Sequence, residues 1–171
     1  MSQKYQIGEY IRYGSNGVCL IDDIRLMGVA KENDLYYILR PIADRNSTFF
    51  IPVESDTAQE KMRTLLTREE IDALIDSVHV DLSVWIDDRK QRMDHYRVLL
   101  RECDPRELLK LAALLYYRKD ALSAEGKKLS PSDLNVLKQI IELTDNEFSF
   151  VLNIDPKEVG PYIRNRTQMN P

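Results

Sequence analysis

The residues best suited to chemistry lie between Trp85 and Arg101, the most densely basic stretch of the chain. It holds five basic and three acidic residues and begins with the only tryptophan. On a helix, residues four and seven positions apart share one face, which would align Trp85 with Arg89 and Arg92. An aromatic ring flanked by guanidinium groups can stack on an exposed base or wedge into a disrupted base step while those groups hold phosphates. This pattern makes the stretch a candidate DNA-contacting helix.

The same pattern also fits a purely structural role. A lone tryptophan is often a core anchor, and a basic helix face is often merely solvated. The basic runs Tyr116–Lys119 and Lys127-Lys128 could extend a phosphate-binding surface, but they fit helix C-termini better, where positive charge interacts favourably with the helix dipole. The formal net charge is −4, whereas coating of nucleic acid requires a dense basic surface. Any DNA contact is therefore expected to be local, and weak without a further anchor.

No pattern in the sequence indicates catalysis, a metal site or a cofactor. The two histidines have no second ligand at metal-binding spacing. Gly14 and Gly17 lack the lysine and the following helix of a phosphate-binding loop. Cys19 and Cys103 lie far apart in apolar or helical surroundings, as expected of two buried thiols in a reducing compartment. We predict a protein that is not an enzyme and that needs no cofactor.

The elements that must position these residues change in character near residue 55. Before it, short β-prone runs alternate with turn residues, which predicts a small antiparallel sheet. The predicted strands are residues 9–13, 18–26, 35–39 and 48–51, separated by turns or loops at 14–17, 27–34 and 44–47. Pro52 would end the last strand because proline has no backbone donor. Four or five short curled strands in so few residues favour an SH3-like or Tudor-like barrel.

From residue 57 onward the pattern is helical. Two capping boxes and three prolines at first helical positions mark helix starts; they are Thr57 with Glu60, Thr67 with Glu70, Pro105, Pro131 and Pro156. A further helix is predicted to begin near Trp85, and Gly160-Pro161 is predicted to end the last one. Apolar residues recur at helical spacing, so these helices are expected to form one bundle.

The predicted fold class is therefore α+β: an N-terminal SH3/Tudor-like antiparallel β-barrel followed by a C-terminal all-helical bundle. Its expected divisions are residues 1–56 for the barrel, 57–82 for connecting helices and a hinge, and 83–171 for the helical domain. No apolar run approaches the roughly 20 residues that span a bilayer. The first ten residues lack the pattern of a signal peptide. A cytoplasmic location is therefore expected.

Several motifs of the first half resemble a known family. They are Gly8-Glu9-Tyr10-Ile11-Arg12-Tyr13, Gly17-Val18, Ile21, Tyr36-Tyr37-Ile38-Leu39 and Ile51-Pro52-Val53. Together they resemble the polymerase-interacting domain shared by CarD-type transcription regulators and transcription-repair coupling factors. The second half is similar to CarD-type regulators in its tryptophan before an arginine-rich helix. The resemblance covers roughly residues 5–152 and departs from the family pattern at Glu9, Ser15-Asn16 and Phe49-Phe50.

The resemblance implies a bacterial regulator with two contact surfaces. The N-terminal domain would add its sheet edge to the protrusion of the RNA polymerase β subunit, and the helical domain would touch promoter DNA at the upstream edge of the bubble. Trp85 would be the wedge, with Arg89 and Arg92 as phosphate contacts. The complete sets of expected contacts are Trp85, Arg89, Lys90, Arg92 and Arg97 for DNA, and Arg25, Tyr37, Arg45 and Phe50 for polymerase.

Two other interpretations stay open. One is an SH3-like protein-binding adaptor that recruits some partner without DNA contact, with Trp85 as part of the core. The other is an enzyme of unrecognised type. Under the leading interpretation the DNA contact is weak and assisted by polymerase, because a tethered module is present at a high local concentration. Neither the direction of regulation nor the oligomeric state is predicted.

Overall fold

A computed structural model of the chain describes residues 4–28 and 34–167. The chain divides into two compact units, Met1–Leu65 and Leu66–Pro171, and each is treated by itself below. Most of the loop predicted at residues 27–34 lies outside the described residues. No helix in the described ranges is both long enough and apolar enough to cross a membrane.

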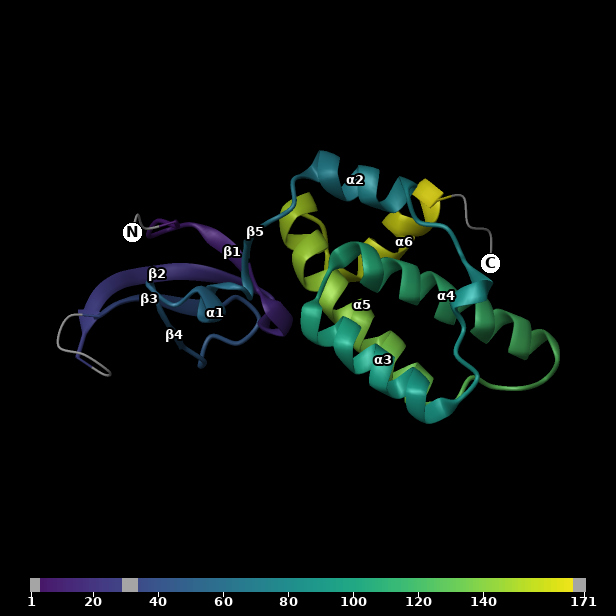
Figure 1. Ribbon diagram of the computed structural model, residues 1–171. Coiled ribbons are helices and arrows are strands. Elements are labelled where there is room, and N and C mark those ends of the chain that lie inside the picture. The colour runs from purple at the N-terminus through teal and green to yellow at the C-terminus, as the bar shows by residue number, and fades with distance from the viewer. Residues whose placement is uncertain (1–3, 29–33, 168–171) are drawn as a thin grey trace. The chain divides into compact units, whose positions relative to one another are not determined.

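The N-terminal unit is built on a five-stranded antiparallel sheet (Figure 1). Its strands are β1 (Tyr10–Tyr13), β2 (Val18–Met27), β3 (Asp34–Pro41), β4 (Phe49–Pro52) and β5 (Met62–Thr64). They are arranged in the order β4-β3-β2-β1-β5, which leaves β4 and β5 as the two edges. A helical unit follows, so the predicted α+β fold class is confirmed.

All four predicted strands are present, because each coincides with a β-prone run bounded by turn residues. The turn between β1 and β2 passes through Gly17, whose φ of 80° suits glycine. The turn before β4 is built on Asp44, whose carboxylate accepts hydrogen bonds from the Asn46 amide at 3.1 Å and from the Ser47 hydroxyl. These hydrogen bonds hold the pKa of Asp44 below its ordinary value.

The position of the fifth strand was not predicted, and the helix predicted at Thr57 is wrong in extent. The single turn of α1 (Asp56–Gln59) begins one residue after Ser55, whose hydroxyl accepts from the Ala58 amide at 3.2 Å. The chain then leaves the helix and pairs with β1 as β5. Met62 is 3% exposed in the sheet core, and its carbonyl accepts from the Tyr5 hydroxyl at 3.2 Å. Burial against β1 thus overrides the local helical signal.

The sheet encloses a core of aromatic and branched side chains. Tyr37 is fully buried in it and stands edge-on to Tyr5, with 5.9 Å between the ring centroids. The Tyr37 hydroxyl accepts from the backbone amides of Lys4 and Tyr5 at 2.9 and 3.3 Å. The core therefore ties the segment before β1 to β3.

The helical unit contains five helices in its described residues: α2 (Arg68–Asp76), α3 (Arg89–Glu102), α4 (Pro105–Ala124), α5 (Pro131–Leu152) and α6 (Pro156–Thr167). The capping box of Thr67 with Glu70 is confirmed, as are the starts at Pro105 and Pro131, which Asp104 and Ser130 cap. Helices α3, α4 and α5 pack together around one core, and α2 and α6 pack on α5 around a second (Figure 1).

Two helix boundaries differ from the sequence prediction. Helix α3 begins at Arg89 rather than near Trp85, because Asp88 caps it through the Gln91 amide at 2.8 Å. Helix α6 continues through Gly160-Pro161 to Thr167. Tertiary contacts hold it: the Tyr162 hydroxyl donates to the Asp72 carboxylate at 2.5 Å, and the Arg166 guanidinium lies 2.7 Å from the Asp76 carboxylate. These contacts outweigh the helix-breaking tendency of proline.

The unexpected strand gives a test by substitution. Met62→Ala should lower the free energy of unfolding by about 2–4 kcal/mol, because it leaves a cavity in the sheet core. Thr64→Ala, at an exposed position of the same strand, should change it by less than about 1 kcal/mol. Urea denaturation of the full chain measures both values. Equal effects of the two substitutions would contradict the pairing of β5 in the core.

Candidate nucleic-acid interface

Trp85 lies on a loop between two capped elements rather than on a helix. A turn of 3-10 helix (Leu82–Val84) precedes it, and the Asp81 carboxylate caps that turn by accepting from the Ser83 amide at 2.9 Å. Trp85 itself is extended, with φ −66° and ψ 129°. Because Asp88 then starts α3, the indole is presented from a short ordered segment at the beginning of that helix.

The indole is stacked between two arginines. The guanidinium carbons of Arg92 and Arg118 lie 4.5 and 4.2 Å from its ring centroid. The ring is half-buried and packs on the core formed by α3, α4 and α5. Each guanidinium–indole contact contributes about 0.5–2 kcal/mol. We call Trp85, Arg92, Arg118 and Asp133 the tryptophan cluster.

Arg92 is buried and forms an ion pair with Asp133. Its Nε and Nη2 donate to the two carboxylate oxygens of Asp133 at 2.9 and 3.1 Å, and Nη1 donates to the carbonyls of Ile86 and Asp87 at 2.9 and 3.1 Å. The side chain of Arg92 is 7% exposed and that of Asp133 is 2% exposed. The hydrogen bonds to Asp133 hold the pKa of Arg92 above its ordinary value.

The geometry of Arg92 removes it from the set of exposed DNA contacts expected from the sequence. All three of its nitrogens are used inside the protein, so in this structure it cannot reach a phosphate. It acts instead as a clamp that joins the loop of Trp85 to α3 and α5. The neighbouring Tyr96 is also buried, and burial together with the Asp133 charge raises its pKa to about 12.

Arg118 is the cluster member that the sequence did not single out, because its run Tyr116–Lys119 fitted a solvated or capping helix end better than a phosphate-binding surface. It is half-buried on α4, and its Nε is buried with no hydrogen-bond partner among the described residues. No ion pair of Arg118 occurs in that part of the chain either. Its charge is therefore balanced chiefly by the indole face, which leaves it able to bind an incoming anion.

The surface around the indole is apolar and mixed in charge. Leu82 and Val84 are 48% and 58% exposed on the 3-10 turn, which is unusual for branched apolar side chains next to a tryptophan. Sequence reasoning missed both of them. Exposed basic and acidic residues follow on the same segment and on α3: Asp87, Asp88, Arg89, Lys90, Asp94 and Arg97.

The other predicted basic contacts on α3 are exposed, and they differ in their hydrogen-bond and ion-pair partners. An Nη of Arg89 donates to the Ser132 hydroxyl at 2.5 Å, and Arg97 pairs with Asp94 at 2.5 Å. Lys90 is exposed, with no ion-pair partner among the described residues. An exposed pair such as Arg97–Asp94 is worth only about 0–1 kcal/mol and can open readily. Arg89, Lys90 and Arg97 therefore stay available to a phosphate.

The candidate polymerase contacts also divide into exposed and buried residues. Phe50 is 46% exposed on the edge strand β4, Arg45 is exposed on the turn before it, and Arg25 is exposed on β2 beside Asp23. Tyr37 is fully buried in the sheet core. Its side chain offers nothing to a partner, so we leave it out of the contact surface.

Other kinds of site find little support in the described ranges. There, no group of three histidine, cysteine, aspartate or glutamate side chains could hold a metal ion. Cys19 and Cys103 are both buried and form no disulfide in the described part of the chain, in line with the sequence prediction. Burial raises the pKa of the Cys19 thiol to about 11, which disfavours the nucleophilic thiolate.

Comparison with known proteins addresses the N-terminal unit. Residues 5–65 match the family model of the CarD-like/TRCF RID domain. The match confirms the resemblance over the segment that contains β1 to β5, and it supports a polymerase-interacting, transcription-related protein. The helical unit lies beyond the matched residues, so the resemblance there stays a prediction. A comparison with curated protein sequences finds no match.

The buried ion pair gives a test with an internal control. Asp133→Ala should lower the free energy of unfolding by about 3–5 kcal/mol, because Arg92 is left buried without a counter-charge. The double variant R92M/D133L should cost much less, since no charge then remains buried. Asp94→Ala, which breaks the exposed pair with Arg97, should cost less than about 1 kcal/mol. If urea denaturation shows that D133A lowers the free energy of unfolding no more than D94A, the buried ion pair between Arg92 and Asp133 is contradicted.

Proposed function

We propose that this protein is a non-enzymatic transcription regulator that binds the RNA polymerase β subunit through its N-terminal unit and contacts promoter DNA through its helical unit. The single observation that carries the proposal is the match of residues 5–65 to the CarD-like/TRCF RID domain, since this segment coincides with a compact unit. The contact with DNA rests on the chemistry of the tryptophan cluster.

The surface proposed for polymerase is the edge of β4. This strand pairs with β3 on one side only, so its outer backbone groups can pair with a strand of the partner. Side chains alternate along it: Phe49 packs toward Tyr13 in the core, with 5.4 Å between rings, and Phe50 is exposed. Backbone pairing would supply affinity, while Phe50 and Arg45 would supply specificity.

The surface proposed for DNA is the exposed side of the tryptophan cluster. Leu82, Val84 and Trp85 provide apolar groups of the kind that wedge between base steps, and Arg89, Lys90 and Arg118 provide cations for the adjacent phosphates. Stacking on a base is worth about 1–3 kcal/mol. That is close to the combined strength of the two arginine stacks, so transfer of the indole onto a base would be nearly balanced in free energy.

A DNA contact whose net free energy is close to zero can still regulate transcription if two conditions hold. Binding to polymerase must raise the local concentration of the tryptophan cluster near the DNA, which compensates for the acidic net charge of the whole chain. The exposed side of the tryptophan cluster must also bind melted DNA more tightly than duplex DNA, because only differential affinity shifts the equilibrium between closed and open promoter. Unstacked bases at the edge of a bubble meet the second condition.

An adaptor without DNA contact is the second candidate function. It is favoured by one observation, the packing of Trp85 against the core between two arginines. In that case the cluster would be a structural feature only. The two functions share a protein contact through the N-terminal unit, whose partner is unspecified for the adaptor, and they differ in what Trp85 does on promoter DNA.

Retention of polymerase tests the N-terminal surface. The full chain on a resin should retain a fragment of the polymerase β subunit that contains the protrusion, and Phe50→Glu should weaken binding at least about tenfold, or 1.4 kcal/mol. Leu26→Glu, which charges another exposed apolar position of the sheet away from the edge, should have little effect. Absence of retention by the unchanged chain would contradict the polymerase proposal.

Open-complex lifetime tests the DNA surface. Trp85→Ala should shorten the lifetime of the promoter open complex by about tenfold, in line with the loss of one stacking contact, while polymerase retention is unchanged. Phe150→Ala, an exposed aromatic at the opposite end of α5 from Asp133, serves as the control. An unchanged lifetime with W85A, at full polymerase occupancy, would favour the adaptor.

A further inference from the structure

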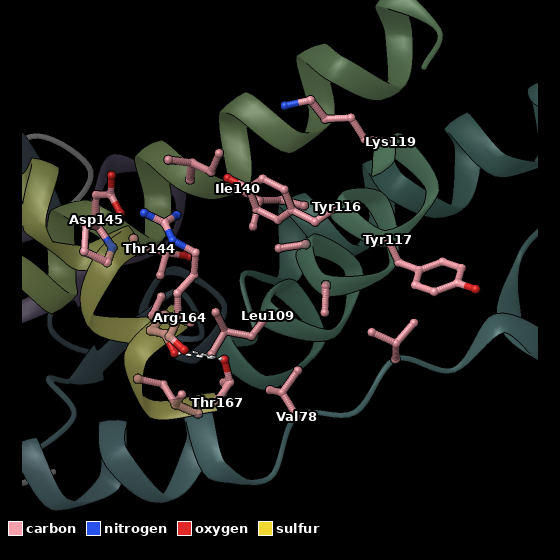
Figure 2. Close-up of a pocket in the computed structure, with 18 of the residues that line it drawn as sticks. Val78, Leu109, Tyr116, Tyr117, Lys119, Ile140, Thr144, Asp145, Arg164 and Thr167 are labelled. Carbon is pink, nitrogen blue, oxygen red and sulfur yellow. Dashed lines mark hydrogen bonds between the residues drawn. The ribbon is translucent and has the colours of Figure 1, made fainter. Parts of the chain in front are cut away.

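The helical unit contains a large cavity that the proposed function does not use. Its volume is about 1100 Å³, and it lies between α4, α5, α6 and the segment that follows α2 (Figure 2). Pockets for small molecules usually measure roughly 300–1,000 Å³, so this one is large enough for a substantial ligand. Most of its wall is apolar, including Leu109, Ala113, Ile140 and Ile163.

The cavity lining has more positively charged than negatively charged side chains. Three cations line it, Lys119, Lys157 and Arg164, against two carboxylates, Asp120 and Asp145. Among the described residues, no ion pair joins any of the three cations to a carboxylate. Asp145 is half-buried, and burial raises its pKa to about 6, so this carboxylate is mostly charged at neutral pH but is protonated more readily than an exposed aspartate. The lining therefore offers unpaired positive charge beside apolar surface.

Two of the lining cations, Lys119 and Arg164, are exposed and so lie at the mouth of the cavity. A methyl group on Gly160 would meet Nη1 of Arg164 at 3.4 Å, so the guanidinium lies against the helix that forms one wall. Nζ of Lys119 lies 5.9 Å from the ring centroid of Tyr116, another lining residue. Figure 2 shows Leu109, Ile140 and Arg164, from three helices, around the same space.

We propose that this cavity is a binding site for an amphipathic anion, with an apolar body between α4 and α5 and one acidic head group at the mouth of the cavity beside Arg164. Charge complementarity decides the sign of the head group, because the lining carries three positive charges against two negative ones and none of the three is ion-paired among the described residues. The apolar wall decides the body, because polar atoms placed against Leu109 and Ile140 would lose hydration without gaining hydrogen bonds.

The test uses the full chain and laurate, a twelve-carbon carboxylate, below its micelle concentration. Isothermal titration calorimetry should show one saturable site. Ala113→Trp, which places an indole inside the cavity, should weaken binding, whereas Ala124→Trp, at an exposed position of the same helix outside the cavity, should not. Arg164→Gln should weaken binding about tenfold, and Arg101→Gln, which removes an equal charge from α3, should leave it unchanged.

The controls separate this site from other occupants. Dodecyltrimethylammonium, with the same chain length and a cationic head, should bind at least tenfold more weakly than laurate. Equal or tighter binding of that cation would overturn the assignment of an anion. Absence of laurate binding, or a dimer in sedimentation equilibrium that A113W dissociates, would overturn the site itself and assign the cavity to a second copy of the chain. Because A113W can destabilise the fold, R164Q carries the test independently.

Discussion

The ion pair between Arg92 and Asp133 is the interaction on which the candidate DNA surface depends. It joins two helices that are far apart in the sequence, and the remaining donors of Arg92 hold the carbonyls of Ile86 and Asp87. These contacts fix the loop of Trp85 and place one face of the indole against a guanidinium. Removing one partner of such a pair is far costlier than never having the pair, because the remaining charge stays buried. The pair therefore specifies the loop geometry more than it adds net stability.

The two units carry different physical tasks. In the N-terminal unit, a sheet with a fully buried Tyr37 presents an open strand edge, which suits backbone pairing with another protein. In the helical unit, α3, α4 and α5 hold the ring of Trp85 against two guanidinium groups, where it could exchange one stacking partner for another. The match to the CarD-like/TRCF RID domain ends at residue 65, where the first compact unit also ends. The proposed combination of a weak DNA contact and a separate polymerase contact is thus consistent with an acidic chain.

The sequence predicted what depends on local patterns and missed what depends on distant partners. Strands β1 to β4, the capping box at Thr67 and the helix starts at Pro105 and Pro131 all follow from turn and capping chemistry, and they are present. Strand β5 was missed because three residues carry little periodicity and its partner lies about fifty positions away. Arg92 was expected to bind phosphate because a single sequence does not reveal that Asp133, itself in a capping motif, neutralises it. Arg118 was not singled out because a single sequence does not reveal that its helix places it over the indole of Trp85.

The most direct test of the account is photocrosslinking from position 85. The residue is replaced by a photoreactive p-benzoylphenylalanine, the protein is bound to polymerase on promoter DNA, and the crosslinked nucleotides are mapped in the open complex. We predict crosslinks confined to the upstream edge of the melted region and absent from the closed complex. Crosslinks only within the helical unit itself, in an open complex that retains the protein, would show that residue 85 never reaches DNA and would contradict the account.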